Sequence, residues 1–486
     1  MRTLVIDIGT SGLRAAVITD DTTVTGLHHE EFAPSTPAPG LVEFDAEAMW
    51  DAVLRVATAA MAGAGVDAVG ITNQRASTVG WRRSTGRPIG PAIGWQDLRT
   101  VGDCIMARIN HGLALAPNQS ATKIAWMLAN HLPDDAARAD DDLMFGTVDT
   151  WITWKLSGGS AHVTDHTNAA VTGLTVADGT AWNPSVLAAL GLHAHQLPSI
   201  VPTAGRCADA VALPGAPPVT ALAGDQQASL VGQGCITPGK AKITFGTGGM
   251  FDMYVGPAAP ASARRNDGGT FPIVAFSDAT ERHYGVEAIM LSAGTNVEWL
   301  RDDMGLISSA EESDAVAASV ATTDGVAYVP ALLGLGTPHW DYGARGALFG
   351  ITRGTTRAHI VRAVLEGVAH RGVDLVEAAE QDTGISVATL HIDGGMSRNA
   401  TFVQALADAS GRPVTVSPVT EATTLGAGLL AGTAAGQWPS LADACARTAG
   451  FRTVRPLGAP GISRQQWTEA VSRSRGWIPD LSSLDF

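Results

Sequence analysis

The sequence feature that most constrains the fold is a unit of strand, glycine-rich turn and strand that occurs twice. In the first copy, an aliphatic run ends at Asp7 and is followed by GTSG at positions 9–12. The second copy carries GTGG at positions 246–249 between two apolar runs. Glycine lets the backbone approach an anion closely, and hydroxyls and successive amides can point at phosphate oxygens. The duplication therefore predicts two related domains, each presenting a turn to a shared cleft that suits a polyphosphate.

The first glycine-rich turn can be interpreted either as part of a metal and phosphate site or as an ordinary hairpin turn. Asp7 stands at the end of the strand, where a carboxylate can hold a hydrated Mg²⁺. Taken alone, the stretch is equally compatible with an ordinary β-hairpin that has a glycine-rich turn. The chain contains neither G-x-x-x-x-G-K-[ST] nor a G-x-G-x-x-G that follows a strand. A P-loop and a dinucleotide-binding fingerprint are therefore excluded as explanations of these turns.

Length and charge limit the class of protein. A chain of 486 residues is too long for one core, and we predict domains at 1–234 and 240–437 and a C-terminal extension at 438–486 that packs back on them. The net charge of −15 argues against a nucleic-acid partner, since phosphate neutralisation needs clustered Lys and Arg. No apolar run is long enough for a membrane span and no secretion signal is recognisable, so we expect a cytoplasmic enzyme without a membrane partner.

Hydrophobic periodicity predicts alternating strands and helices, and thus an α/β fold. Strands at 3–7, 14–19 and 24–31 form a meander that leads to a helix at 45–62. A hairpin is expected at 77–89 and a helix at 289–303. A long amphipathic helix is expected at 357–381.

Asp225 is the candidate catalytic base. It comes directly after a short apolar strand, in the segment AGDQQ near the boundary of the two halves. A carboxylate there can accept the proton of an attacking hydroxyl while Asp7 serves the metal. An aspartate before a helical run can instead be a simple N-cap.

Two other sets of residues suggest a sugar and a nucleotide. Arg75 with Trp95 can grip a polyol, the arginine through hydroxyls and the indole through C–H groups. The alternative is a core tryptophan and a surface arginine. Gly395 and Asn399 lie at a strand-to-helix turn that can admit adenine or ribose, or that simply starts a helix. Together with the turns and Asp225, these sets indicate phosphoryl transfer.

Eight motifs in one order resemble those of the FGGY carbohydrate kinases, and within that family they are most similar to the glycerol kinases. The resemblance implies an actin- or hexokinase-like pair of ribonuclease-H-type domains that close on ATP and substrate. The motifs are DIGTS at 7–11, GITNQR at 70–75, WQD at 95–97, GTVDTW at 146–151, GDQQ at 224–227, GTG at 246–248, ARG at 344–346 and DGG at 393–395.

The resemblance also implies roles for individual residues. Asp225 would be the general base, and Asp7 would be directed at Mg²⁺. The residues that would meet the nucleotide are Thr10, Ser11, Arg14, Gly246, Thr247, Gly294, Glu298, Gly395 and Asn399, although glycerol kinases more often have glutamine at the position of Glu298. The residues that would line the acceptor pocket are Arg75, Ala76, Trp95, Asn118, Asp225, Gln226 and Met250.

Three departures from the glycerol kinases lie in the acceptor pocket. Those enzymes have glutamate, tyrosine and phenylalanine where this chain has Ala76, Asn118 and Met250. A buried hydroxyl without its partner costs roughly 1 to 3 kcal/mol, enough to weaken glycerol binding about tenfold or more. We therefore predict a small polyol or ketose with four or five carbons, phosphorylated at a primary hydroxyl.

Other functions stay open at this point. A true glycerol kinase that makes glycerol 3-phosphate is the main alternative. A non-catalytic sensor of nucleotide and polyol would have little use for both Asp7 and Asp225, and an actin- or chaperone-like ATPase would have none for Arg75 and Trp95. Acceptor-stimulated ADP production separates these classes from a kinase. A homodimer is also compatible with the sequence.

Overall fold

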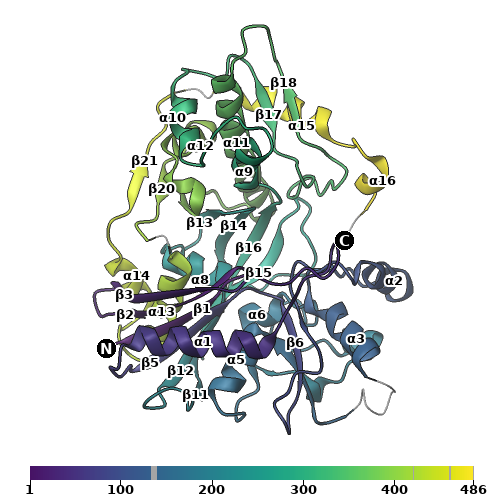
Figure 1. Cartoon of the computed structure of the whole chain (residues 1–486), viewed down its shortest axis with the longest axis vertical. Helices are drawn as coiled ribbons and strands as arrows, with labels where there is room; N and C mark the ends of the chain where they lie inside the picture. The colour runs from purple at the N-terminus through teal and green to yellow at the C-terminus, as the bar shows by residue number, and fades with distance from the viewer. Residues whose placement is uncertain (133–139, 420, 459–460, 485–486) are drawn as a thin grey trace.

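Two mixed β-sheets organise the chain, and their four central strands have the same order (Figure 1). The computed structural model describes residues 1–132, 140–419, 421–458 and 461–484. The first sheet has the order β11-β12-β5-β1-β2-β3 and the second has the order β15-β16-β14-β13-β19-β20-β21. In each, the strand before the glycine-rich turn pairs antiparallel with the strand after it and parallel with a later strand. The predicted duplication is thus a repeat of topology.

The strands of the first sheet are β1 (Thr3–Ile8), β2 (Gly12–Ile18), β3 (Val24–Glu31), β5 (Ala68–Asn73), β11 (Ala204–Asp209) and β12 (Pro218–Gly224). Those of the second are β13 (Lys240–Phe245), β14 (Gly249–Gly256), β15 (Phe271–Ser277), β16 (Arg282–Met290), β19 (Thr389–Asp393), β20 (Val414–Val416) and β21 (Arg452–Val454). Smaller sheets contain β4 (Glu43–Phe44), β6 (Thr78–Arg82), β7 (Ala92–Ile93), β8 (Leu143–Thr147), β9 (Val163–Asp165), β10 (Ser199–Val201), β17 (Ala327–Val329) and β18 (Ala347–Phe349).

Helices cover both sheets (Figure 1). In the first half they are α1 (Ala46–Met61), α2 (Val101–His111), α3 (Ser120–His131), α5 (Val148–Leu156), α6 (His166–Ala170), α7 (Pro184–Leu190) and α8 (Asp225–Gly232). In the rest they are α9 (Thr295–Asp302), α10 (Glu312–Ala318), α11 (Arg357–Thr383), α12 (Ala400–Ser410), α13 (Ala422–Ala434), α14 (Leu441–Arg447), α15 (Arg464–Ser474) and α16 (Pro479–Ser482). Among the described residues, no helix is both long and apolar enough to cross a membrane.

Helix α1 shows how local sequence and packing agree. The Asp45 carboxylate accepts hydrogen bonds from the backbone N–H groups of Glu47 and Ala48, which caps the helix. The buried side chains on one face include Met49 and Val53, and that face packs on β1, β2 and β3. The predicted meander and the helix that follows it are confirmed.

Two helices cross at the junction of the two halves. Helix α8 follows β12 and contacts both sheets, through β5 and β12 on one side and β14 and β15 on the other, whereas α13 follows β20 but packs on β1, β5 and β12 of the first sheet. The two helices cross very closely. A Cβ atom at Gly426 would lie 1.8 Å from the backbone oxygen of Ala228, and one at Gly232 would lie 2.0 Å from that of Ala422. Glycine is therefore required at both positions.

One predicted element forms with an additional partner and another is wrong in part. The 77–89 hairpin closes through the Trp81–Pro88 bridge and the backbone hydrogen bonds Arg82 N–H to Arg87 and Ile89 N–H to Gly80, while β8 also pairs with β6 along its whole length. The helix predicted at 289–303 begins at Thr295, because residues up to Met290 belong to β16. A buried strand and a buried helix share the same apolar composition, so periodicity does not separate them over a short run.

The C-terminal segment begins against the first half, where the Trp438 indole N–H donates to the Asp20 carbonyl, and the part from β21 onward packs back on the second half. Strand β21 pairs with β20, and α15 packs beside β17. Arg464 of α15 forms an ion pair with Asp374 of α11 (Nη2–Oδ1 2.6 Å), and the Trp467 indole N–H donates to the same carboxylate. This charged contact holds α15 in place.

Candidate active site

Asp225 lies at the junction of β12 and α8. Gly224 occupies the helix N-cap position and Asp225 is the first helical residue. The Asp225 carboxylate accepts a hydrogen bond from the Gln226 backbone N–H (Oδ1–N 2.8 Å), and no side chain caps α8. Asp225 is therefore not the N-cap residue of α8, although its carboxylate accepts a hydrogen bond from one of the free N–H groups of the first turn. Burial raises the pKa of Asp225, and the nearby Arg75 charge opposes that rise.

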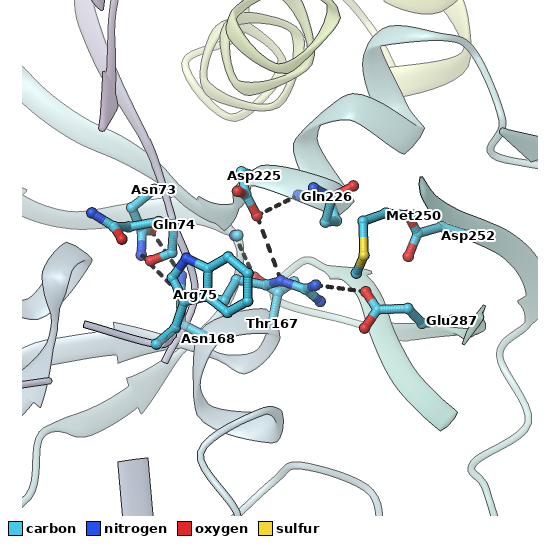
Figure 2. Close-up of polar contacts among 12 residues, drawn as sticks. Asn73, Gln74, Arg75, Thr167, Asn168, Asp225, Gln226, Met250, Asp252 and Glu287 are labelled. Atoms are coloured by element: carbon cyan, nitrogen blue, oxygen red, sulfur yellow. Dashed lines mark hydrogen bonds and ion pairs between the residues drawn. The ribbon is translucent and has the colours of Figure 1, made fainter. Parts of the chain in front are cut away.

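Arg75 connects Asp225 to the second sheet (Figure 2). Arg75 follows β5, which neighbours β12, and its Nε lies 3.5 Å from Asp225 Oδ1. Its Nη2 lies 2.6 Å from Oε2 of Glu287 on β16. The arginine stem passes against Gly224, where a Cβ atom would lie 2.7 Å from Arg75 Cδ. Glycine before Asp225 thus lets the arginine reach the carboxylate.

Arg75 is mostly buried and Trp95 is exposed, so the alternative of a core tryptophan with a surface arginine is wrong. The Arg75 side chain is 12% exposed, whereas Trp95 is 37% exposed. The Trp95 indole N–H donates to the Thr10 hydroxyl (Nε1–Oγ1 3.0 Å). An aromatic surface next to the acceptor pocket is therefore bonded to the first glycine-rich turn.

Three buried charged residues near Arg75 are absent from the residues predicted from the sequence. Lys242 on β13 and Asp252 on β14 are both fully buried, and their Nζ and Oδ2 atoms lie 2.7 Å apart. Lys242 Nζ also donates to Gln226 Oε1 (2.6 Å). Glu287 is opposite Asp252 in the sheet, and burial raises its pKa against the Arg75 charge. A charged residue inside an apolar strand was the available signal, because such residues are rarely buried unless paired.

Asp7 is a buried carboxylate whose one ion pair among the described residues, to the Arg14 guanidinium, is long. Its side chain is 4% exposed, and its Oδ2 accepts a hydrogen bond from Thr424 of α13 (2.9 Å). Arg14 Nη1 is 3.9 Å away, and the Arg14 Nε is taken up by Glu421 at 3.2 Å. Burial raises the pKa of Asp7 to about 6. Such a carboxylate fits an oxygen ligand of a cation.

No group of three or more His, Cys, Asp or Glu in the described parts of the chain is arranged to hold a metal ion. Mg²⁺ is usually bound by one or two carboxylates together with waters and substrate phosphates. Asp7 beside the phosphate turn therefore fits Mg²⁺ carried by a nucleotide better than a metal held by protein alone.

The second glycine-rich turn contacts two further predicted residues. The Gly294 N–H donates to the Gly246 carbonyl and the Ala293 N–H to that of Thr247, both at 2.8 Å. Gly394 has φ +84°, and a Cβ there would lie 2.4 Å from the carbonyl oxygen of Phe245. The structure thus brings the 246–247, 294 and 394–395 backbones together. Glu298 is exposed in the first turn of α9.

Asn399 does start a helix. Its Oδ1 accepts from the Phe402 backbone N–H (2.8 Å) and so caps α12, while its Nδ2 donates to Ser313 (3.0 Å). The helix-start alternative is confirmed for this residue. A short 3-10 turn at Gly395–Arg398 separates it from the Gly394–Gly395 backbone.

The three departures from the glycerol kinases lie on different segments of the structure. Ala76 is buried with φ +60°, and its carbonyl accepts from Ser120 at the start of α3 (3.2 Å). That contact places the chain around Asn118 next to Ala76, with Asn118 itself exposed. Met250 lies near Glu287 and Asp252 (Figure 2). No glutamate follows Arg75, and its two carboxylate partners are Asp225 after β12 and Glu287 on β16.

A separate hollow of about 310 Å³ lies among α2, α3 and α7, lined in part by Met106, Trp126 and Leu190. It contains none of the predicted site residues.

Comparison with models of known protein families identifies the family of this chain. The model described as "FGGY family of carbohydrate kinases, N-terminal domain" matches residues 2–232, and the C-terminal domain model matches residues 241–435. The chain belongs to the FGGY carbohydrate kinases. It is a phosphotransferase with an alcohol group as acceptor, and the actin- or hexokinase-like fold predicted from the sequence is confirmed.

This FGGY kinase is 42% identical to the glycerol kinase of Bordetella parapertussis over 98% of its own length and 97% of that protein. It is also 42% identical to the glycerol kinase of Dechloromonas aromatica, with the same coverage. The crystal structure of Plasmodium falciparum glycerol kinase with ADP superposes with a TM-score of 0.90 at 26% identity, covering 97% of this chain and 98% of that one. A xylulose kinase from Lactobacillus acidophilus shares the fold, with a TM-score of 0.86 at 18% identity over 99% of each chain.

Proposed function

We propose that this FGGY kinase transfers the γ-phosphoryl group of ATP to a primary hydroxyl of glycerol and so makes glycerol 3-phosphate. The observation that carries the proposal is the Asp225–Arg75 pair at the junction of the two halves. The similarity to glycerol kinases over nearly the whole chain supports glycerol as the acceptor. It favours this acceptor over the four- or five-carbon acceptor predicted from the sequence.

In this proposal Asp225 is the catalytic residue that accepts the proton of the attacking hydroxyl. Burial raises its pKa, which makes it a stronger base than an exposed aspartate. Arg75 opposes that rise and so keeps the carboxylate available. Arg75 Nη1 is buried, and the described residues offer it no hydrogen-bond partner. That N–H is available to a hydroxyl of the acceptor, with Gln226 and Trp95 beside it.

The nucleotide would lie between the two glycine-rich turns. Thr10, Ser11 and Arg14 would meet its phosphates from the first half and Gly246 and Thr247 from the second, because amides, hydroxyls and a guanidinium complement phosphate charge. The rest of the nucleotide pocket would be formed by Gly294, Glu298, Gly395 and Asn399. Mg²⁺, held through Asp7, would neutralise charge on the phosphates during transfer.

A second candidate acceptor is a polyol or ketose of four or five carbons. Ala76 carries no carboxylate to receive a hydroxyl proton, and Asn118 is exposed and smaller than the tyrosine found in glycerol kinases. Met250 replaces an aromatic wall. These positions leave room and unmatched polarity at the end of the pocket away from Asp225.

The experiment is ADP release by the purified protein with Mg²⁺-ATP over glycerol, tetritols, pentitols and the ketoses of the same lengths. Glycerol should give the highest kcat/KM. A higher value for a four- or five-carbon acceptor would establish the second candidate instead. Release that no acceptor stimulates would reject both kinases and leave an ATPase or a sensor.

We further propose that the functional division of the chain follows residues 1–234, 240–437 and 438–486. The first part would carry the acceptor pocket and the first phosphate turn. The second would carry the nucleotide pocket, and the third would pack back on it. A cytoplasmic location and a homodimer stay predictions.

A further inference from the structure

A buried lysine controls the amide of Gln226. Lys242 Nζ donates to Gln226 Oε1 (2.6 Å), Thr244 Oγ1 (3.0 Å) and the Met250 carbonyl oxygen (3.5 Å). Asp252 Oδ2 lies 2.7 Å from the same nitrogen, and both charged side chains are fully buried. The lysine is therefore held by three strand residues and reaches across to α8 with its remaining contact.

This contact determines which way the Gln226 amide points. A lysine ammonium donates hydrogen bonds and accepts none, so the atom that faces Lys242 has to be the amide oxygen. The Gln226 N–H₂ group is therefore the end of the amide that does not face Lys242. In the described part of the chain it has no hydrogen-bond partner.

Among the described residues, the same side of the pocket has one donor that is both buried and unsatisfied. Arg75 Nη1 is buried without a described partner, while its Nη2 and Nε face Glu287 and Asp225. Ala76 contributes no acceptor next to it. This end of the acceptor pocket therefore presents N–H donors, and these donors match a ligand oxygen that accepts hydrogen bonds.

We propose that Lys242 is a positioning residue that holds Gln226 with its amide N–H groups toward the acceptor, and thereby makes this end of the pocket select a hydrogen-bond-accepting oxygen. The proposal rests on the proposed kinase function but not on the identity of the polyol. Lys242 belongs to the C-terminal domain match and Gln226 to the N-terminal one, so the contact also joins the two FGGY domains at the acceptor.

The test needs a variant that folds. Removing Lys242 alone would leave Asp252 as an unpaired buried charge, which is strongly destabilising. Replacing the pair together, by Lys242→Met with Asp252→Leu, removes both charges and keeps apolar volume. Lys155→Met is the matched control, because Lys155 forms an ion pair with Glu47 (2.7 Å), away from the predicted site.

We expect the double variant to raise the KM of the best acceptor about tenfold, with kcat within about threefold and the KM for ATP within about twofold. The control should match the wild type. An unchanged acceptor KM in a folded double variant would overturn the role of Lys242 and leave the proposed function intact. A wild-type protein that no acceptor stimulates would overturn both proposals.

A second background distinguishes positioning from a structural role. If Lys242 acts through the Gln226 amide, adding the double variant to Gln226→Ala should raise the acceptor KM by less than about twofold. An undiminished tenfold loss there would show that Lys242 acts only on the fold.

A third variant covers the case in which the double variant fails to fold. Gln226→Glu keeps Lys242 paired but replaces the amide donors by acceptors, so it should raise the acceptor KM by at least about tenfold. Wild-type acceptor KM in Gln226→Glu would overturn the proposal.

Discussion

The two halves of this kinase share the order of their four central strands but place their carboxylates on different strands. In the first half β1 carries Asp7 near the turn, and the neighbouring β5 ends in Asn73. In the second half the equivalent of Asp7 is Thr244 on β13, and the acid is Asp393 at the end of β19. Topology was therefore duplicated while the chemistry was divided between the halves.

The acceptor side shows the same division. Arg75, Asp225 and Gln226 come from the first half, but the buried charges that hold them come from the second. Glu287 contacts Arg75, and Lys242 contacts Gln226. Neither half would present an ordered acceptor pocket by itself.

The largest effect is expected where the first half supplies a group that the second lacks. Asp225→Asn should lower kcat by about 10³-fold, since general bases contribute roughly 10² to 10⁴ in rate. Binding of Mg²⁺-ATP, measured by calorimetry, should stay within about twofold. Asp209→Asn is a control, because Asp209 is part-exposed and pairs with Arg206. Near-normal turnover in Asp225→Asn would reject the base assignment.

The next largest effect tests the difference between Asp7 and Thr244. Asp7→Thr makes the first turn resemble the second, and should lower kcat about 10²-fold and raise the Mg²⁺ concentration needed for half-maximal activity. The measurement is a Mg²⁺ titration of acceptor-dependent ADP release at saturating ATP. An unchanged titration would show that Asp7 does not serve the metal.

The close crossing of α8 and α13 can be tested by a substitution at Gly426. Gly426→Ala should lower the free energy of unfolding by about 1 to 3 kcal/mol, because its Cβ would lie 1.8 Å from the Ala228 oxygen and the helices would have to separate. Urea unfolding measures the change. Gly102→Ala is the matched control, since Gly102 lies in α2 with open space around its Cβ position. That control should be neutral or slightly stabilising.

The buried charge of Asp7 predicts a pH-dependent stability. Its pKa is about 6 in the fold instead of 3.8, so the folded state binds the proton more tightly than the unfolded state. The contribution of Asp7 to stability therefore falls as the pH rises from about 4 to about 6, by about 3 kcal/mol at most. Asp7→Asn should lack this fall and be the more stable protein above pH 6. Parallel stability profiles for the two proteins would contradict the prediction.

The smallest effect concerns the acceptor pocket. Ala76→Glu should lower the KM for glycerol about tenfold by restoring a hydrogen-bond acceptor, and should leave the KM for ATP unchanged. The strained φ of +60° is already present with alanine, so glutamate adds no further backbone cost. A rise in the glycerol KM would instead favour a pocket built for a longer acceptor.

Several elements were predictable because their signals are local. The two strand-turn-strand units, the Asp45 cap and the strand before Asp225 follow from alternation, glycine and cap residues. The helix predicted at 289–303 was partly wrong, because the apolar run to Met290 pairs in the middle of a sheet. The sequence also left open whether Arg75 or Trp95 is the more buried residue, because burial of Arg75 depends on the strands that lie next to β5.

The sequence by itself determined the family, the duplicated α/β topology and the residues that stand at the strand ends. Those properties depend on short-range patterns in the chain. Only the tertiary structure decided that Lys242 contacts Gln226 and pairs with Asp252, that Glu287 contacts Arg75, that Asn399 caps α12 and that Asp225 is not the N-cap of α8. The reason is physical: buried charges are tolerated only beside partners, and the Lys242–Gln226 and Arg75–Glu287 contacts both join residues from opposite halves of the chain.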